Sequence, residues 1–85
     1  MKFSHTPTRI YSIAENGALQ AEITFPMVSK GVYCINHTFV DDSLRGQGIA
    51  SALVQAAVAQ IREMGGQVTA TCSYARDWLQ RHPEA

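Results

Sequence analysis

The sequence predicts a single α/β domain over residues 1–85, with a mixed sheet and the element order βββαβα. Three observations predict this class. Apolar and polar residues alternate through residues 19–25, which is the pattern of a half-buried strand. Residues 49–64 repeat apolar side chains at helical spacing. A glycine-containing turn, residues 45–50, joins a strand to that helix, and 85 residues leave room for only one domain.

Three strands are expected before the helix. Residues 9–15 form the first, as an exposed edge that is open to pairing with another chain. Asn16 and Gly17 then supply the two positive-φ positions of a tight hairpin turn. The return strand, residues 19–25, ends at Pro26, which has no N–H group to donate to the sheet.

The third strand, residues 32–41, leads toward the helix. Its apolar residues fall on both faces, so we expect a strand that is covered on both sides. Gly65 and Gly66 end the helix, because glycine readily takes the left-handed cap. A short buried strand, residues 67–72, follows. A right-handed crossover places it parallel to the third strand, whereas the first three strands run antiparallel.

The last helix is expected over residues 74–82. Ser73 is its expected N-cap, and Pro83 stands just beyond its end. Trp78 and Leu79 are the side chains through which it should join the core.

The composition excludes several classes of partner. Seven basic residues balance seven acidic ones, so net charge indicates neither a nucleic-acid nor a membrane-surface partner. The longest apolar-rich stretch, residues 48–61, is too short and too polar to span a bilayer, and no signal peptide is evident, so a cytoplasmic location is expected. Cys34 and Cys72 form no C-x-x-C pair and no zinc spacing, which predicts two free thiols and no metal. The two cysteines could still lie on adjacent strands.

The turn over residues 45–50 has the features of an anion site. The first amides of a helix are unpaired and carry partial positive charge. Gly46 and Gly48 allow unusual backbone angles and a close approach of the backbone to a phosphate. Arg45 adds a forked cation, and Ser51 adds a hydroxyl from the first helical turn.

Two common phosphate motifs do not fit this turn. A P-loop requires Lys-Ser/Thr after its last glycine, where Ile49 and Ala50 stand. A dinucleotide fingerprint that starts at Gly46 would place its third glycine at Ser51, and the acidic residue it needs further on is missing around residues 69–71. A plain strand-to-helix turn with incidental glycines is a further alternative.

A third motif fits. Residues 40–50, Val-Asp-Asp-Ser-Leu-Arg-Gly-Gln-Gly-Ile-Ala, resemble the signature of the GNAT N-acetyltransferases, Arg/Gln-x-x-Gly-x-Gly/Ala. Arg45, Gly48 and Ala50 occupy its defined positions. Many relatives have proline where Asp42 stands, which we expect to cost loop rigidity but no ligand group.

The resemblance implies a truncated GNAT acyl-CoA N-acyltransferase fold that binds acetyl-CoA or coenzyme A. The backbone amides of the turn would hold the pyrophosphate, and the pantetheine arm would run along the end of the third strand. The residues expected at this cofactor site are Phe39, Val40, Arg45, Gly46, Gln47, Gly48, Ile49, Ala50 and Ser51.

A narrower resemblance covers most of the chain. Residues 37–40 (His-Thr-Phe-Val), residues 72–75 (Cys-Ser-Tyr-Ala) and Trp78-Leu79 near His82-Pro83-Glu84 are similar to the minimal, single-domain group of small uncharacterised N-acetyltransferases. That group lacks the extra helices and late strands that enclose the acceptor in full-length relatives. We therefore expect an open acceptor site, suited to an exposed amine of a peptide or protein, or to a polyamine.

Cys72 is the first candidate for chemistry. It stands before the last helix, whose N-terminus would lower the pKa of the thiol, and the resemblance implies that it lies near the CoA thiol. Three roles stay open. Cys72 accepts the acetyl group as a thioester, lines the thiol pocket during direct transfer, or packs as a small buried side chain.

Tyr74 and His37 are the other catalytic candidates. Tyr74 either protonates the leaving thiolate or stacks on Trp78 one turn later. His37 either deprotonates an incoming ammonium or is a hydrogen-bonded core histidine. Asp41 and Asp42 are alternative bases, although their expected role is to shape the loop. The solvated surface is the expected place of His5, His82, Arg76 and Arg81, although both arginines are long enough to reach the phosphates or adenine of CoA.

The sequence thus predicts an acetyl-CoA-dependent N-acetyltransferase, a monomer or weak dimer, that acts on an amine acceptor it does not identify. The alternative from another class is a non-catalytic acyl-CoA-binding or interaction module that keeps the phosphate turn.

Overall fold

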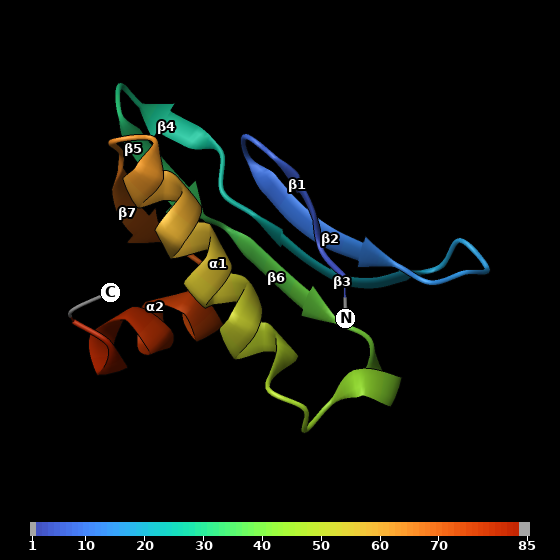
Figure 1. Cartoon of the computed structure of the whole chain (residues 1–85). Coiled ribbons are helices and arrows are strands. Elements are labelled where there is room, and N and C mark those ends of the chain that lie inside the picture. Colours follow the sequence, from blue (N-terminus) through green and yellow to red (C-terminus); the bar gives the residue numbers. More distant parts are fainter. Residues whose placement is uncertain (1, 84–85) are drawn as a thin grey trace.

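The computed structural model describes residues 2–83 and contains two short sheets (Figure 1). Within these residues the strands are β1 (Ser4–Thr6), β2 (Arg9–Ile13), β3 (Leu19–Thr24), β4 (Met27–Ser29), β5 (Val32–Ile35), β6 (His37–Val40) and β7 (Gln67–Ala70). The first sheet has the order β1-β2-β3-β6 and is antiparallel throughout. The second has the order β4-β5-β7, in which β4 is antiparallel and β7 parallel to β5.

The expected third strand is wrong as a single strand, because Asn36 divides it. The Asn36 amide donates to the Thr24 carbonyl at 3.2 Å, and the Thr24 hydroxyl donates to Asn36 Oδ1 at 2.5 Å. Before this point β5 pairs with β7, and after it β6 pairs with β3. The predicted pairings are confirmed, antiparallel for the first three strands and parallel for the last, but they belong to two sheets.

The predicted order βββαβα also omits two short strands. β1 is polar and carries no apolar alternation, yet it pairs with β2 and covers the edge that was expected to be exposed. β4 follows Pro26 directly and pairs with β5, where a loop was expected. Each strand has three residues, too few for a period of two to register in the sequence.

The hairpin turn between β2 and β3 is present, but it uses one positive φ, +88° at Gly17, rather than two.

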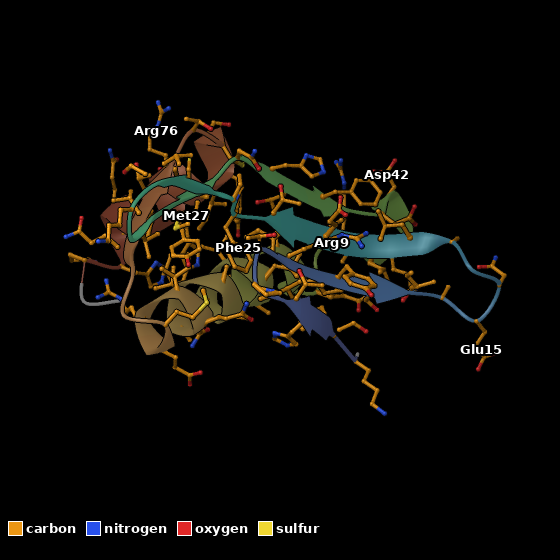
Figure 2. All side chains as sticks on the ribbon, turned by 90° about the horizontal axis from the view of Figure 1, so that it is seen from above. Arg9, Glu15, Phe25, Met27, Asp42 and Arg76 are labelled. Carbon is orange, nitrogen blue, oxygen red and sulfur yellow. The ribbon has the colours of Figure 1, made fainter. Side chains whose placement is uncertain are left out.

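Two helices and one 3₁₀ turn complete the part of the chain that the structure describes. These are η1 (Asp42–Leu44), α1 (Ile49–Glu63) and α2 (Ser73–Arg81). The start of α1 matches the prediction, and its apolar stripe packs on both sheets, with α2 beside it (Figure 1). Phe25 lies fully buried between helix and sheet (Figure 2). The core comprises Ile10, Ala21, Ile23, Phe25, Ile35, Ile49, Leu53, Val54, Ala57, Val58, Ile61, Ala75 and Trp78.

Only one face of the first sheet is packed against α1. On β6, Thr38 and Val40 are half-buried, whereas His37 and Phe39 point to the opposite face and are exposed. The expectation that this strand is covered on both sides is therefore wrong for β6. The last strand is likewise not fully buried, because β7 lies at the edge of its sheet and alternates between exposed and half-buried residues. No helix within residues 2–83 has the length and apolar character needed to cross a membrane.

Candidate functional site

The connection from β6 to α1 begins with a turn that Asp41 organises. Its carboxylate accepts a hydrogen bond from the Ser43 amide at 3.1 Å and another from the Ser43 hydroxyl. The hydroxyl and then the amide of Ser43 lower the pKa of Asp41, because both stabilise the charged form. Asp41 thus has the predicted loop-shaping role. Asp42 pairs instead with Arg45, with Oδ1 2.9 Å from the guanidinium Nε, and both side chains are largely exposed.

Two glycines set the path from this turn into α1. Gly46 and Gly48 have φ values of +82° and +73°, in the left-handed region. A Cβ atom built on either would meet nothing within 4 Å, so the backbone angle, not lack of space, requires glycine. Gly48 is the N-cap of α1 and has no side chain to cap the helix. The first-turn amides of α1 are therefore left for another acceptor, as an anion site requires.

A hollow of about 460 Å³, called here the turn hollow, adjoins these amides. Its walls come from the end of β6, the glycine turn, the first turn of α1 and the start of α2. The lining residues are Thr38, Val40, Leu44, Arg45, Gly46, Gly48, Ile49, Ala50, Ser51 and Tyr74. Of the expected cofactor residues, this includes all but Phe39 and Gln47. Gln47 lies within the turn but outside the lining.

Cys72 lies where the two sheets diverge. The amides of Thr71 and Cys72 both donate to the Ile35 carbonyl, at 3.1 and 3.2 Å, and these are the final contacts of this segment with β5. The Cys72 thiol donates to Thr38 Oγ1 on β6, with a Sγ–Oγ1 distance of 3.6 Å. Cys72, not Ser73 as expected, is the N-cap of α2. Cys72 is half-buried, whereas Cys34 is buried with its thiol on Thr71, and both are free.

The surroundings of Cys72 favour its thiolate. Burial raises the pKa of the thiol. The amide of Ala75, the hydroxyl of Thr38 and the amides of Tyr74 and Thr38 together lower the pKa by more than burial raises it, so the net shift is downward. Ala75 and Tyr74 belong to the first turn of α2, so the amides at the start of this helix stabilise the thiolate. This position gives a nucleophile or a thiol-binding wall at one end of the site.

Tyr74 lines the turn hollow and is 42 % exposed. The alternative in which it stacks on Trp78 is wrong, because the ring that stacks on Trp78 is His82, at 4.0 Å between centroids. The Trp78 indole Nε1 instead donates to Ser51 Oγ at 2.8 Å. Ser51 is thereby held at the rim of the turn hollow, where its own hydroxyl hydrogen remains available for a further acceptor.

His37 and Phe39 lie away from this group, on the open face of the first sheet. His37 Nε2 is 3.5 Å from Glu22 Oε1, and the other carboxylate oxygen of Glu22 contacts Arg9 Nε at 2.5 Å. His37 is thus an exposed residue beside a carboxylate, not the core histidine that the sequence allowed. The structure gathers Cys72, Tyr74 and the glycine turn, and it leaves His37 on the other face.

Sequence reasoning missed Thr38 and Leu44 as site residues. Thr38 contacts Cys72 and lines the hollow together with Val40, two residues along the same strand. The strand period of two would have paired Thr38 with Val40, and it would have placed Phe39 with His37. No group of three or more His, Cys, Asp or Glu side chains among residues 2–83 is arranged to hold a metal ion. Glu84, part of the C-terminal motif, lies outside the described residues.

Comparisons with known proteins identify the relatives of this chain. A family model described as GCN5-related N-acetyl-transferase matches residues 10–85. The chain is 32 % identical over 76 residues to protein NATD1 of Mus musculus, a match that covers 88 % of this chain and 69 % of that protein. The Xenopus tropicalis NATD1 protein is also 32 % identical, over 88 % and 70 % of the two chains. A GCN5-like protein from Staphylococcus aureus, solved by NMR, superposes with a TM-score of 0.76 at 34 % identity and covers 95 % of this chain and 79 % of its own.

Proposed function

The chain belongs to the GCN5-related N-acetyltransferase family, and we propose that it transfers an acetyl group from acetyl-CoA to an exposed amine. The observation that carries this proposal is one continuous arrangement. The turn hollow extends from the uncapped amides of α1 to Tyr74, and its wall residue Thr38 contacts Cys72. One end suits a pyrophosphate and the other suits a thioester.

The pyrophosphate end rests on backbone chemistry. The first-turn amides of α1 and the positive end of the helix dipole attract an anion. Arg45 lies at the same wall, and its guanidinium has further N–H donors beyond the Nε that contacts Asp42. Ser51 offers a hydroxyl that Trp78 holds in place. These groups together fit a diphosphate, with no side chain of like charge among the lining residues.

The pantetheine arm would lie along β6. This strand ends the first sheet, so its outer edge is unpaired within the described residues. The Asp41 amide donates to the Gln20 carbonyl on β3, and amides alternate in direction along a strand, so the Thr38 and Val40 amides face the outer edge. A pantetheine arm carries two amide groups, and an extended chain with such groups can pair with an exposed strand edge. Thr38 and Val40 supply the side-chain wall.

The reaction then needs an amine, a thioester and two proton transfers. In direct transfer the amine nitrogen attacks the thioester carbonyl carbon, the C–S bond breaks, and the nitrogen loses a proton to water or a base. Tyr74, which lines the hollow and is exposed, would give a proton to the departing CoA thiolate. In the covalent route the Cys72 thiolate attacks first and releases CoA, and the amine then attacks the acetyl-cysteine.

The acceptor would reach the site from solvent. The open face of the first sheet carries His37 and Phe39 beside the Thr38 position, with no described element packed over it. We propose an amine on a peptide or protein, or a polyamine, because such a group can enter a site that lacks closing walls. The proton that the amine loses would pass to water, because His37, beside Glu22, lies on the face of β6 opposite the turn hollow.

Binding and catalysis are separated by one set of measurements. Acetyl-CoA should raise the melting temperature of the wild type in a concentration-dependent way. Thiol release from acetyl-CoA should then exceed background with at least one amine of a panel that spans peptides and polyamines. A stabilised protein with only background release supports the non-catalytic binding module, and an unchanged melting temperature contradicts CoA binding altogether.

The Cys72→Ala variant distinguishes the two routes of transfer. Acid quench of the wild type with acetyl-CoA, followed by mass spectrometry, should show an acetyl adduct at Cys72 if the covalent route operates. Retained transfer by Cys72→Ala indicates direct attack. Cys34, which is buried, serves as the internal control thiol in both proteins.

A further inference from the structure

The open face of the first sheet carries an arginine that the proposed transfer chemistry does not use. Arg9 and Tyr11 alternate along β2 with buried residues, so their side chains lie on the face that α1 does not cover. The register of β2 and β3 places Tyr11 opposite Glu22, which lies on the same face. Arg9, Tyr11 and Glu22 therefore form one cluster on an uncovered surface.

Two contacts fix the guanidinium of Arg9. Its Nε is 2.5 Å from Glu22 Oε2, and its Cζ lies 3.9 Å from the centroid of the Tyr11 ring. The Arg9 side chain is 37 % exposed, whereas that of Glu22 is 17 % exposed, so the surface presents the cation of this pair more than the anion. Within residues 2–83 the terminal nitrogens Nη1 and Nη2 of Arg9 donate no hydrogen bond.

A guanidinium that is held in this way is suited to binding a carboxylate. Arginine presents its N–H donors in a planar fork that matches the two oxygens of a carboxylate, and a fixed fork loses less freedom on binding. Both oxygens of Glu22 already face a neighbour, because Oε1 is 3.5 Å from His37 Nε2 while Oε2 contacts Arg9. The open face therefore offers donors for one further carboxylate.

The position of Arg9 sets the length of a ligand that reaches both this arginine and the thioester. In the first sheet β3 lies between β2 and β6, and the outer edge of β6 is where the thioester would lie. Neighbouring strands are about 4.8 Å apart, so about 10 Å separates β2 from β6. An extended peptide covers about 3.4 Å per residue. A peptide that begins at the β6 edge would thus reach Arg9 with its third or fourth residue.

The surface between these two points favours a peptide over a polyamine. Phe39 of β6 is 36 % exposed on the open face and offers an apolar contact to a side chain of a peptide. A polyamine would instead bring a second positive charge toward the guanidinium of Arg9, which is unfavourable. Charge complementarity therefore selects an acceptor that carries a negative group at some distance from its amine.

We propose that the acceptor is the free N-terminus of an acidic peptide that lies across the open face of the first sheet, with the carboxylate of its third or fourth residue bound by Arg9. This inference rests on the proposed function and names its acceptor class. Arg9 determines specificity without touching the reacting atoms, and Glu22 and Tyr11 position its guanidinium.

Acetyl transfer to a series of C-terminally amidated hexapeptides tests this. Each peptide carries one aspartate, at the second to the sixth position of an alanine and serine sequence, and its partner carries asparagine there. For the wild type we expect kcat/KM to be about threefold to tenfold higher with aspartate at the third or fourth position, as one charge-assisted contact at a partly exposed site would give. We expect little difference at the other positions.

Two variants of Arg9 extend the test. Arg9→Gln should bring the ratio of aspartate to asparagine kcat/KM close to one, and Arg9→Lys should keep part of it, because lysine keeps the charge but not the fork. The matched control is Lys30→Gln, since Lys30 is exposed between β4 and β5 and its loss changes the net charge equally. The ratio compares two peptides on one protein, so partial loss of folded protein does not alter it.

Each result has a defined meaning. Equal kcat/KM for aspartate and asparagine peptides at every position, a preference at other positions, or transfer to polyamines alone overturns the acidic-peptide proposal while the proposed function stands. An equal fall of the ratio in Arg9→Gln and Lys30→Gln also overturns it, because net charge would then be responsible. Background thiol release with every amine contradicts the proposed function, and the acidic-peptide proposal with it.

Discussion

The indole Nε1 of Trp78 donates a hydrogen bond to Ser51 Oγ over 2.8 Å. This bond fastens α2 to the first turn of α1, next to the glycine turn that opens the helix. Trp78 is only 7 % exposed, so its N–H group depends on this partner. The same contact holds Ser51 at the rim of the turn hollow.

Replacement of Ser51 by alanine should therefore destabilise the domain. The buried indole N–H would lose its acceptor, at a cost of about 1–3 kcal/mol in the free energy of unfolding. Ser51→Thr, which keeps a hydroxyl, should lose less. Urea denaturation followed by tryptophan fluorescence measures both, with Ser29→Ala on the exposed strand β4 as the control. Equal stability of Ser51→Ala and the control would show that the bond contributes nothing.

Gly48 should tolerate asparagine better than alanine. Its φ of +73° is strained for any side chain, while a Cβ atom there meets nothing within 4 Å. We expect Gly48→Ala to lower the free energy of unfolding by about 1 kcal/mol, and Gly48→Asn by less, because asparagine adopts this region more readily. Gly66→Ala is the contrasting case. There the new Cβ would lie 2.8 Å from Tyr33 Cδ1, so steric overlap and not φ causes the loss.

Cys72 should be alkylated at lower pH than an ordinary cysteine. Burial opposes the thiolate, but Ala75, Thr38 and Tyr74 stabilise it, so the pKa of the thiol is lowered overall. Thr38→Val removes the stabilising hydroxyl and should move the pH profile of iodoacetamide modification upward. Mass spectrometry of the labelled peptide measures this, with buried Cys34 as the internal reference. An unchanged profile in Thr38→Val would contradict the role of the hydroxyl.

Asp42 should weaken the hold of the turn on CoA. Its carboxylate lies 2.9 Å from Arg45 Nε and competes with an incoming pyrophosphate for that guanidinium. Because the pair is exposed, we expect Asp42→Asn to raise CoA affinity only about twofold to fivefold, with the gain reduced at high salt. Glu15→Gln, at the hairpin tip, changes net charge equally and is the control (Figure 2).

The dependence on Arg45 makes this prediction specific. In an Arg45→Gln background, Asp42→Asn should have almost no effect on CoA affinity, since the competing pair is already broken. An equal gain in both backgrounds would show that Asp42 acts through its general charge.

Much of the fold could be predicted from local sequence patterns. The alternation of residues 19–25 placed β3, and the apolar stripe of α1 correctly predicted its buried face. The glycine turn was also readable, because positive φ at Gly46 and Gly48 is a property of the local backbone. These features depend on residues that are close together in the sequence, so they can be predicted from the sequence alone.

The division of residues 32–41 into two strands in different sheets could not be predicted from local pattern. Both halves of this segment are suited to a strand, so their composition does not tell that β5 pairs with β7 while β6 pairs with β3. The break at Asn36 depends on its bonds to Thr24, twelve residues earlier. The predicted roles of Phe39 and His37 as site residues met the same limit, because both lie on the face of β6 that α1 does not cover.

By itself, then, the sequence determined the glycine turn, the helix that follows it and the position of Cys72 before a second helix. The tertiary structure alone decided that Thr38 lies against Cys72, that Trp78 binds Ser51 and that a second hollow adjoins the turn. The reason is physical. Local periodicity and backbone preference act over a few residues, whereas the Thr38–Cys72 and Ser51–Trp78 contacts join side chains 34 and 27 residues apart. The second hollow is lined by residues of both helices, and only the packing of α1 and α2 against the divided sheet brings all of these together.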